Sequence, residues 1–178
     1  MEDNMVSVNT LKNKKEWDVK VLIDSVNKAL DVLYEKDHIL IENNVEEECI
    51  VSVFTRYFER IMLEKKLLTP NISIDNEYNR DFLSESTYKK ILYDDEYHII
   101  KPDFIMHERG KNTNNILVIE FKKSSNRNES DRRIDHIKLS KLTDSKFNYE
   151  YILGLFIDLT PNRMDVVIKK YIDGQIVE

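Results

Sequence analysis

The stretch "KPDFIMHERGKNTNNILVIEFKK", residues 101–123, decides the predicted fold and raises the question of function. Two runs rich in apolar residues flank the polar loop "ERGKNTN", and this pattern is typical of a β-hairpin. The second run nevertheless contains Glu120 and Lys122, and Asp103 stands at the head of the first. The hairpin therefore places charged side chains where a buried strand would carry apolar ones.

The alternation of side chains along a strand shows which residues share a face. One face of the second strand carries Val118, Glu120 and Lys122, and the face of the first strand that carries Asp103 also carries Ile105. Two interpretations follow. Glu120 and Lys122 form a surface ion pair on a sheet face open to water, or the charged residues are buried with Asp103 in a site.

The buried interpretation has a definite chemistry. A carboxylate among apolar groups is costly unless its charge is compensated, and a divalent cation held by Asp103 and Glu120 would compensate both. This arrangement suits Mg²⁺-assisted attack of water on a phosphodiester, with Mn²⁺ able to replace Mg²⁺. Lys122 would orient the water or stabilise the charge that develops on phosphorus.

The rest of the chain predicts one α/β domain over residues 1–178, with a central mixed sheet flanked by helices. No segment rich in Pro, Gly or Ser marks a second domain. Helices are predicted over 14–36, 45–68 and 129–143, with Asn43 or Asn44 as the cap of the second. Strands are predicted over 71–79, 98–107, 115–123, 149–159 and 164–172, and residues 84–92 are ambiguous.

Composition limits the function classes. The chain has 178 residues, 41% of them hydrophobic, enough for a proper core. The single cysteine, Cys49, excludes an intrachain disulfide and a multi-cysteine zinc site. The sequence shows no charged-then-apolar leader and no apolar run of membrane-spanning length, so we expect a cytoplasmic protein without a membrane partner.

Charge is distributed unevenly along the sequence. The net charge is −6, yet residues 122–146 hold 8 Lys and Arg against 4 Asp and Glu. This segment is the expected contact surface for nucleic acid, carried by Lys123, Arg132, Arg133 and Lys138; the alternative is an ordinary solvated helix face. Because the whole chain is acidic, we also expect a homodimer or a protein partner that adds basic surface.

Pro102-Asp103, followed after 16 residues by Glu120-Phe121-Lys122, resembles the signature of the PD-(D/E)xK nuclease superfamily. The segments "EYNR", "KPDFIMHERG" and "NILVIEFKKS" resemble a group of small bacterial and phage-associated proteins of this fold. The resemblance implies a restriction-endonuclease-like core over 43–178, an N-terminal helical extension over 1–42, and a metal-dependent nuclease acting on DNA. The alternative is a catalytically silent module of this fold that binds nucleic acid or a protein.

The superfamily often supplies a further acid from its first core helix. Among the three consecutive candidates, helical-wheel geometry puts Glu47 about 30° from the apolar direction, Glu46 about 70° and Glu48 about 130°. Glu47 is therefore expected to support the metal, although all three also favour a helix N-terminus electrostatically. Three residues near these elements are secondary candidates: Glu77, Arg80 and His107.

Overall fold

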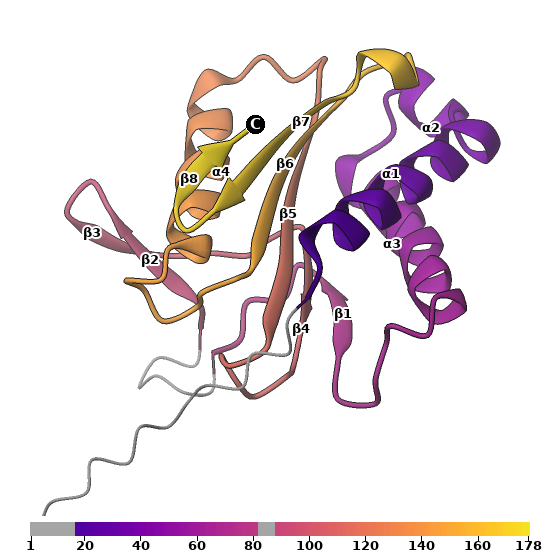
Figure 1. Cartoon of the computed structure of the whole chain (residues 1–178). Helices are drawn as coiled ribbons and strands as arrows, with labels where there is room; N and C mark the ends of the chain where they lie inside the picture. Colours follow the sequence, from indigo (N-terminus) through magenta and orange to yellow (C-terminus); the bar gives the residue numbers. More distant parts are fainter. Residues whose placement is uncertain (1–16, 82–87) are drawn as a thin grey trace, which may run out of the picture.

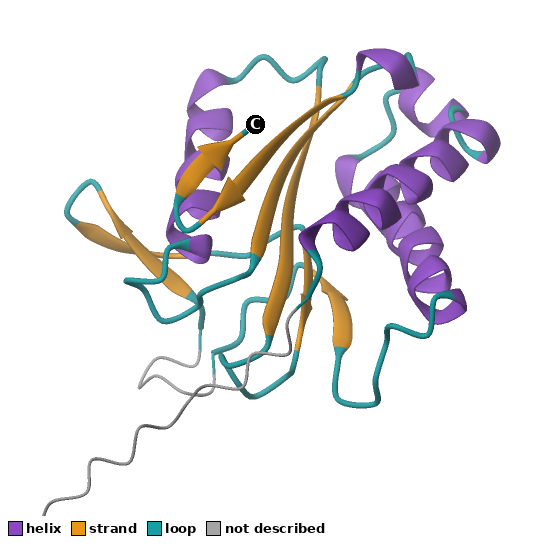
Figure 2. Ribbon diagram, viewed as in Figure 1, coloured by secondary structure: helices purple, strands orange, loops and turns teal. Residues whose placement is uncertain are grey.

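The computed structural model describes residues 17–81 and 88–178 and shows an α/β arrangement in which helices cover both faces of a mixed sheet (Figures 1 and 2). The start of the helix predicted over 14–36 and part of the ambiguous segment 84–92 lie outside the described residues. None of the helices in the described ranges is both long enough and apolar enough to cross a membrane.

Three helices precede the sheet: α1 (Val19–Lys36), α2 (Ile39–Glu42) and α3 (Glu47–Glu64). The prediction that Asn43 or Asn44 caps the helix now labelled α3 is wrong, because Glu46 occupies the N-cap position. The two asparagines instead end α2. Asn43 is its C-cap, and Asn44 adopts a left-handed conformation (φ 52°) that reverses the chain.

The central sheet has six strands in the order β1-β4-β5-β6-β7-β8. Their bounds are Ser73–Asn76, Phe104–His107, Asn115–Lys123, Leu153–Leu159, Val167–Ile172 and Gln175–Val177 in chain order. Among the strands in the described ranges, β5 and β6 alone pair in parallel, and α4 (Glu129–Thr143) connects them across one face. A short 3₁₀ turn, η1 (Arg163–Asp165), precedes β7. The predicted mixed sheet is confirmed.

The predicted strand over 98–107 is two separate strands. Residues Glu96–Ile99 form β3, which pairs with β2 (Lys90–Tyr93) in a hairpin apart from the main sheet, and β4 begins at Phe104. The N–H of Ile100 still donates to the carbonyl of Lys89. Pro102 then has no N–H to donate, so the ladder stops and the chain changes sheets.

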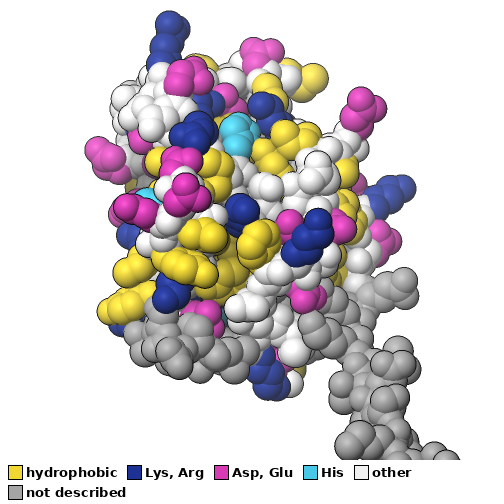
Figure 3. Space-filling model, turned by 90° about the vertical axis from the view of Figure 1, so that its left-hand side faces the viewer, with side chains coloured by type: hydrophobic (Ala, Val, Ile, Leu, Met, Phe, Trp, Pro, Cys, Tyr) yellow, Lys and Arg dark blue, Asp and Glu magenta, His cyan; other side chains and the backbone are white. Residues whose placement is uncertain are grey.

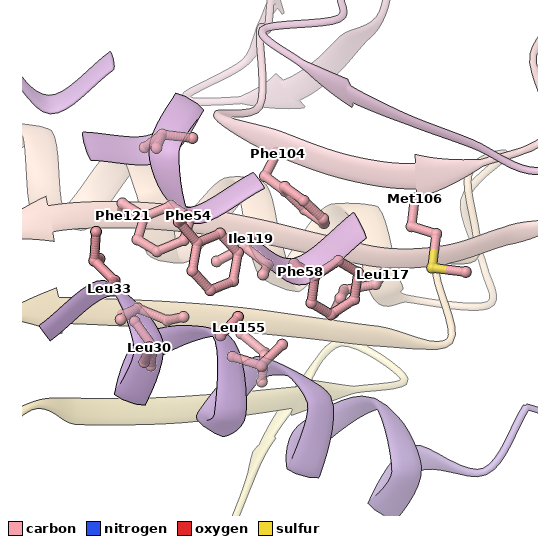
Figure 4. Packing of buried hydrophobic residues seen from close by; sticks show 14 of the residues in the cluster. Leu30, Leu33, Phe54, Phe58, Phe104, Met106, Leu117, Ile119, Phe121 and Leu155 are labelled. Carbon is pink, nitrogen blue, oxygen red and sulfur yellow. The ribbon is translucent and has the colours of Figure 1, made fainter. Parts of the chain in front are cut away.

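The core lies on both faces of the sheet. Helices α1 and α3 cover one face, where the rings of Phe54 and Phe58 pack against Phe104 and Phe121 at centroid distances of 5.0 to 5.8 Å (Figure 4). Helix α4 covers the other face, over a smaller cluster that includes Ile105, Val118 and Phe156. The side chains of the β4–β5 hairpin therefore alternate between the two clusters, as the sequence pattern predicts.

Gly154 in β6 sets how closely α4 approaches the sheet. A Cβ atom at this position would lie 2.9 Å from Cγ2 of Thr143 and 3.3 Å from Cδ2 of Leu139, both on α4, and 3.2 Å from Cβ of Tyr171. The absence of a side chain thus permits a helix–sheet contact that alanine would push apart.

We expect Gly154→Ala to lower the free energy of unfolding by about 1–3 kcal/mol, because its methyl group overpacks the contact with α4. Urea unfolding followed by circular dichroism measures this change, with the exposed-site variant Ser145→Ala as control. Equal stability of Gly154→Ala and wild type would show that α4 moves away without cost.

Candidate functional site

Glu120 is the most deeply buried charged residue of the predicted set. Its side chain is 0% exposed and faces α4 from the middle of β5. Nζ of Lys138 lies 3.1 Å from Oε2, while Oε1 has no hydrogen-bond partner among the described residues. Burial, and next the nearby charge of Asp103, raise the pKa of Glu120 well above its ordinary value. The interpretation of Glu120 and Lys122 as an ion pair on a sheet face open to water is therefore wrong.

Asp103 precedes β4 and reaches across to β5. Its Oδ2 accepts a hydrogen bond of 2.7 Å from the backbone N–H of Phe121, the residue between Glu120 and Lys122. Burial raises the pKa of Asp103 to about 6, and the charges of Asp135 and Glu47 act in the same direction. Asp103 thus belongs with Glu120, as the sequence predicts.

Lys122 extends from the same face of β5 as Glu120 and is 9% exposed. Its Nζ lies 2.9 Å from Oδ2 of Asp135 and 3.3 Å from Oε1 of Glu47. Burial lowers the pKa of Lys122, but the two carboxylates outweigh this effect and the pKa is raised. The side chain is therefore an ammonium group and a hydrogen-bond donor rather than a base.

Glu47 reaches the site from the first turn of α3, and its predicted inward direction is confirmed. Its Oε2 accepts from the backbone N–H of Lys123 at 2.9 Å. The neighbouring Glu46 and Glu48 are exposed. The α3 N-terminus thus brings a third carboxylate to the end of β5.

Two residues of α4 complete the cluster. Asp135 was missed by the sequence prediction; it is 3% exposed and contacts both Lys122 and Lys138. Lys138, predicted to face nucleic acid, lies inside, with Nζ 2.8 Å from Oδ1 of Asp135 and 3.1 Å from Glu120. Asp135 precedes Leu139 and Leu142 by four and seven residues on the buried face. An acid at a core position of the helical pattern was the available signal.

The carboxylates of the cluster outnumber its ammonium groups. Four carboxylates face two ammonium groups, which leaves two negative charges when all are ionised. This charge and the free Oε1 of Glu120 fit a divalent cation. Within the described ranges, however, no three His, Cys, Asp or Glu side chains are placed to hold a metal ion together. Asp103 and Glu120, with Glu47 near Asp103, are the carboxylates of the cluster that could hold a cation.

A cleft of about 510 Å³ opens at Asp103 and Glu47. Its lining is acidic, with Glu46, Glu48 and Glu77 and without Lys or Arg. The secondary candidate Glu77 therefore lies at the cleft. It also forms an ion pair with Lys101 at 2.8 Å.

The other two secondary candidates have structural partners instead. His107 contacts Asp75 at 3.0 Å and its ring packs against Tyr78. Arg80 lies over the ring of Tyr88 at 4.6 Å.

The remaining predicted nucleic-acid contacts also have partners within the chain. Nζ of Lys123 donates to the carbonyls of Asn44 and Val45. Arg132 forms two hydrogen bonds with Asp158, at 2.8 and 3.1 Å. Arg133 pairs at 3.1 Å with Asp94, but both side chains are more than half exposed, so this pair is weak.

The sequence matches no protein-family model and no curated protein. One solved structure that resembles the chain is described as the crystal structure of SSO0001. It is 16% identical, and the alignment covers 84% of this chain and 64% of that structure, with a TM-score of 0.30. This chain thus spans less than two thirds of that protein, and the likeness is too weak to assign a shared fold.

We expect Asp103→Asn to stabilise the metal-free protein above about pH 7, by up to about 3 kcal/mol. Burial raises the folded-state pKa of Asp103 to about 6, above its ordinary value of 3.8, so the ionised carboxylate destabilises the fold at neutral pH. The gain should shrink as the pH falls through this range and be largely lost at about 4, where the wild-type group is protonated in the folded state and about half protonated in the unfolded state. Asparagine keeps the oxygen that accepts from Phe121.

Urea unfolding in EDTA between about pH 4 and pH 8 measures this difference. Asp24→Asn, at an exposed position of α1, is the control and should show no such pH dependence. A gain in the free energy of unfolding of Asp103→Asn that is independent of pH would mean that the ionised carboxylate of Asp103 does not destabilise the fold.

Proposed function

We propose that this chain is a Mg²⁺-dependent phosphodiesterase that hydrolyses DNA, with Mn²⁺ able to substitute. The observation that carries the proposal is Glu120, a fully buried carboxylate with one unpartnered oxygen beside the carboxylate of Asp103. A protein gains no stability from such a pair without a cation, so a function is the better account of it.

The order of elements supports a restriction-endonuclease-like core. Helix α3 leads into β1, the β4–β5 hairpin carries the acidic motif, and α4 returns the chain to the parallel strand β6. This order resembles that of the PD-(D/E)xK superfamily, with α1 as an additional helix. A free, exposed Cys49 is compatible with the reducing cytoplasm we propose for this protein.

The chain's own residues would divide the chemistry as follows. Asp103 and Glu120 hold the cation, which when bound supplies Lewis-acid stabilisation of the charge on phosphorus. Lys138 fixes Oε2 of Glu120 and leaves Oε1 without a partner among the described residues. Lys122, as an ammonium group held by Asp135 and Glu47, donates to a phosphoryl oxygen and so stabilises the transition state.

The second candidate is a catalytically silent module of the same fold that binds nucleic acid or a protein. Two observations favour it. Lys122 and Lys138 already neutralise part of the acidic cluster, and the cleft at Asp103 is acidic and would repel phosphates. Metal binding and turnover distinguish the two functions.

We expect isothermal titration calorimetry to show Mg²⁺ or Mn²⁺ binding that Asp103→Ala and Glu120→Ala each abolish, because these carboxylates are the proposed ligands. Glu48→Ala, in the same acidic cleft but outside the cluster, should bind the metal as wild type does. Metal binding by both ligand variants that equals that of wild type would refute the proposed site at Asp103 and Glu120.

We expect Lys122→Ala to leave metal affinity nearly unchanged and to lower single-turnover cleavage of DNA by about 10²- to 10³-fold, the usual loss for an electrostatic stabiliser. The exposed Lys28→Ala is the matched control. Cleavage by wild type that survives Lys122→Ala would refute the role of this lysine. Absence of cleavage by wild type on DNA and RNA, with metal binding intact, would favour the silent module.

A further inference from the structure

Two clefts lie on the outer side of α4, away from the acidic cleft. The larger, of about 870 Å³, runs between α4 and strands β6 and β7; the smaller, of about 370 Å³, lies between the β2–β3 hairpin and the segment after α4. Lys141 lines both, so the two clefts adjoin. Figure 3 views this side and shows Lys and Arg side chains around a group of exposed apolar ones.

These clefts have the opposite charge to the whole chain. Their combined linings hold 7 Lys and Arg against 3 Asp and Glu, in a protein of net charge −6. Four of these cations form no ion pair at contact distance with a carboxylate among the described residues: Arg127, Lys141, Lys146 and Lys169. They are available to phosphate groups, unlike Arg132, which is held by Asp158.

The smaller cleft adds aromatic rings to this charge. Tyr97 on β3 is 69% exposed, and Nζ of Lys90 lies 5.3 Å from its ring centroid. Phe147 has Nζ of Lys141 at 4.4 Å from its ring. The hairpin holds Tyr97 in place, because Ile91 on its other face is buried in the core beneath α4.

We propose that the two clefts form one binding track for a single strand of nucleic acid, which we call the α4 track: Arg127, Lys141, Lys146, Lys169, Tyr97 and Phe147. Phosphates contact the four unpaired cations, and bases stack on the two rings. The proposal rests on the proposed function and names its substrate class. An exposed aromatic ring beside a lysine suits unpaired bases, whereas a duplex keeps its bases stacked inside.

The dimensions agree with a short strand. Helix α4 has 15 residues and is therefore about 22 Å long, and Arg127 and Lys146 lie just beyond its two ends. At about 3.4 Å per stacked nucleotide, this length accommodates about six nucleotides. Ser124, two residues beyond Lys122, lines the larger cleft, so the track passes close in sequence to the candidate site.

Fluorescence anisotropy in EDTA, with a labelled oligothymidylate of about 12 nucleotides and a duplex of equal length, tests the track without cleavage. We expect single strands to bind more tightly than the duplex. Tyr97→Ala should weaken single-strand binding about tenfold or more, and Tyr97→Phe should restore it. Lys141→Glu should lower affinity and reduce the salt slope by about 0.7 or more.

Two exposed positions away from the track supply matched controls, Met164→Ala for the ring and Lys28→Glu for the charge, and neither should change binding. Equal affinity for duplex and single strand, or unchanged binding by Tyr97→Ala, overturns the proposal. So does an effect of Tyr97→Ala on oligomeric state alone, which would make the hairpin a contact between copies. Metal titration is independent of these results and tests the proposed function separately.

Discussion

The burial of the Glu120 carboxylate is the constraint on which the arrangement around β5 depends. A charge in the middle of a strand that is covered by α4 must find compensation nearby. Lys138 supplies part of it, Asp135 holds Lys138, and Lys122 joins Asp135 to Glu47. Two helices that are distant in sequence, α3 and α4, are thereby tied to β5 by alternating charges.

This compensation is incomplete in a specific way. The ammonium groups contact Asp135, Glu47 and one oxygen of Glu120, while the other oxygen of Glu120 has no partner in the described part of the chain. A purely structural network gains most when every buried polar atom is paired. The unpaired oxygen is therefore the feature that separates this cluster from an ordinary buried salt-bridge network.

Much of the site was predictable because strand alternation is a strong constraint. The period of two placed Glu120 and Lys122 on one face of their strand and Asp103 with Ile105 on one face of the other, and the helical wheel selected Glu47 over its neighbours. Alternation alone left open whether the face of Glu120 was buried. The hairpin loop and the mixed sheet also follow from local patterns. These predictions succeeded where one regular element determines the direction of a side chain.

The errors have a different origin. The direction of Lys138 depends on how α4 rotates against the sheet, and its basic sequence suggested a solvated face. The break between β3 and β4 depends on a hairpin that leaves the main sheet. Both are tertiary properties. Asp135, an acidic residue among the apolar positions of the helix, was the local sequence signal that this face of α4, which also carries Lys138, is buried.

The close approach of α4 at Gly154 has a consequence for the cluster as a whole. The helical residues nearest to Gly154 are Leu139 and Thr143, and Leu139 directly follows Lys138. The height of α4 above the sheet, and with it the separation of Asp135 and Lys138 from Glu120, is therefore set at a position that carries no charge and no side chain. Sequence changes that alter this helix–sheet spacing would retune the electrostatics of the cluster while leaving each of its charged residues in place.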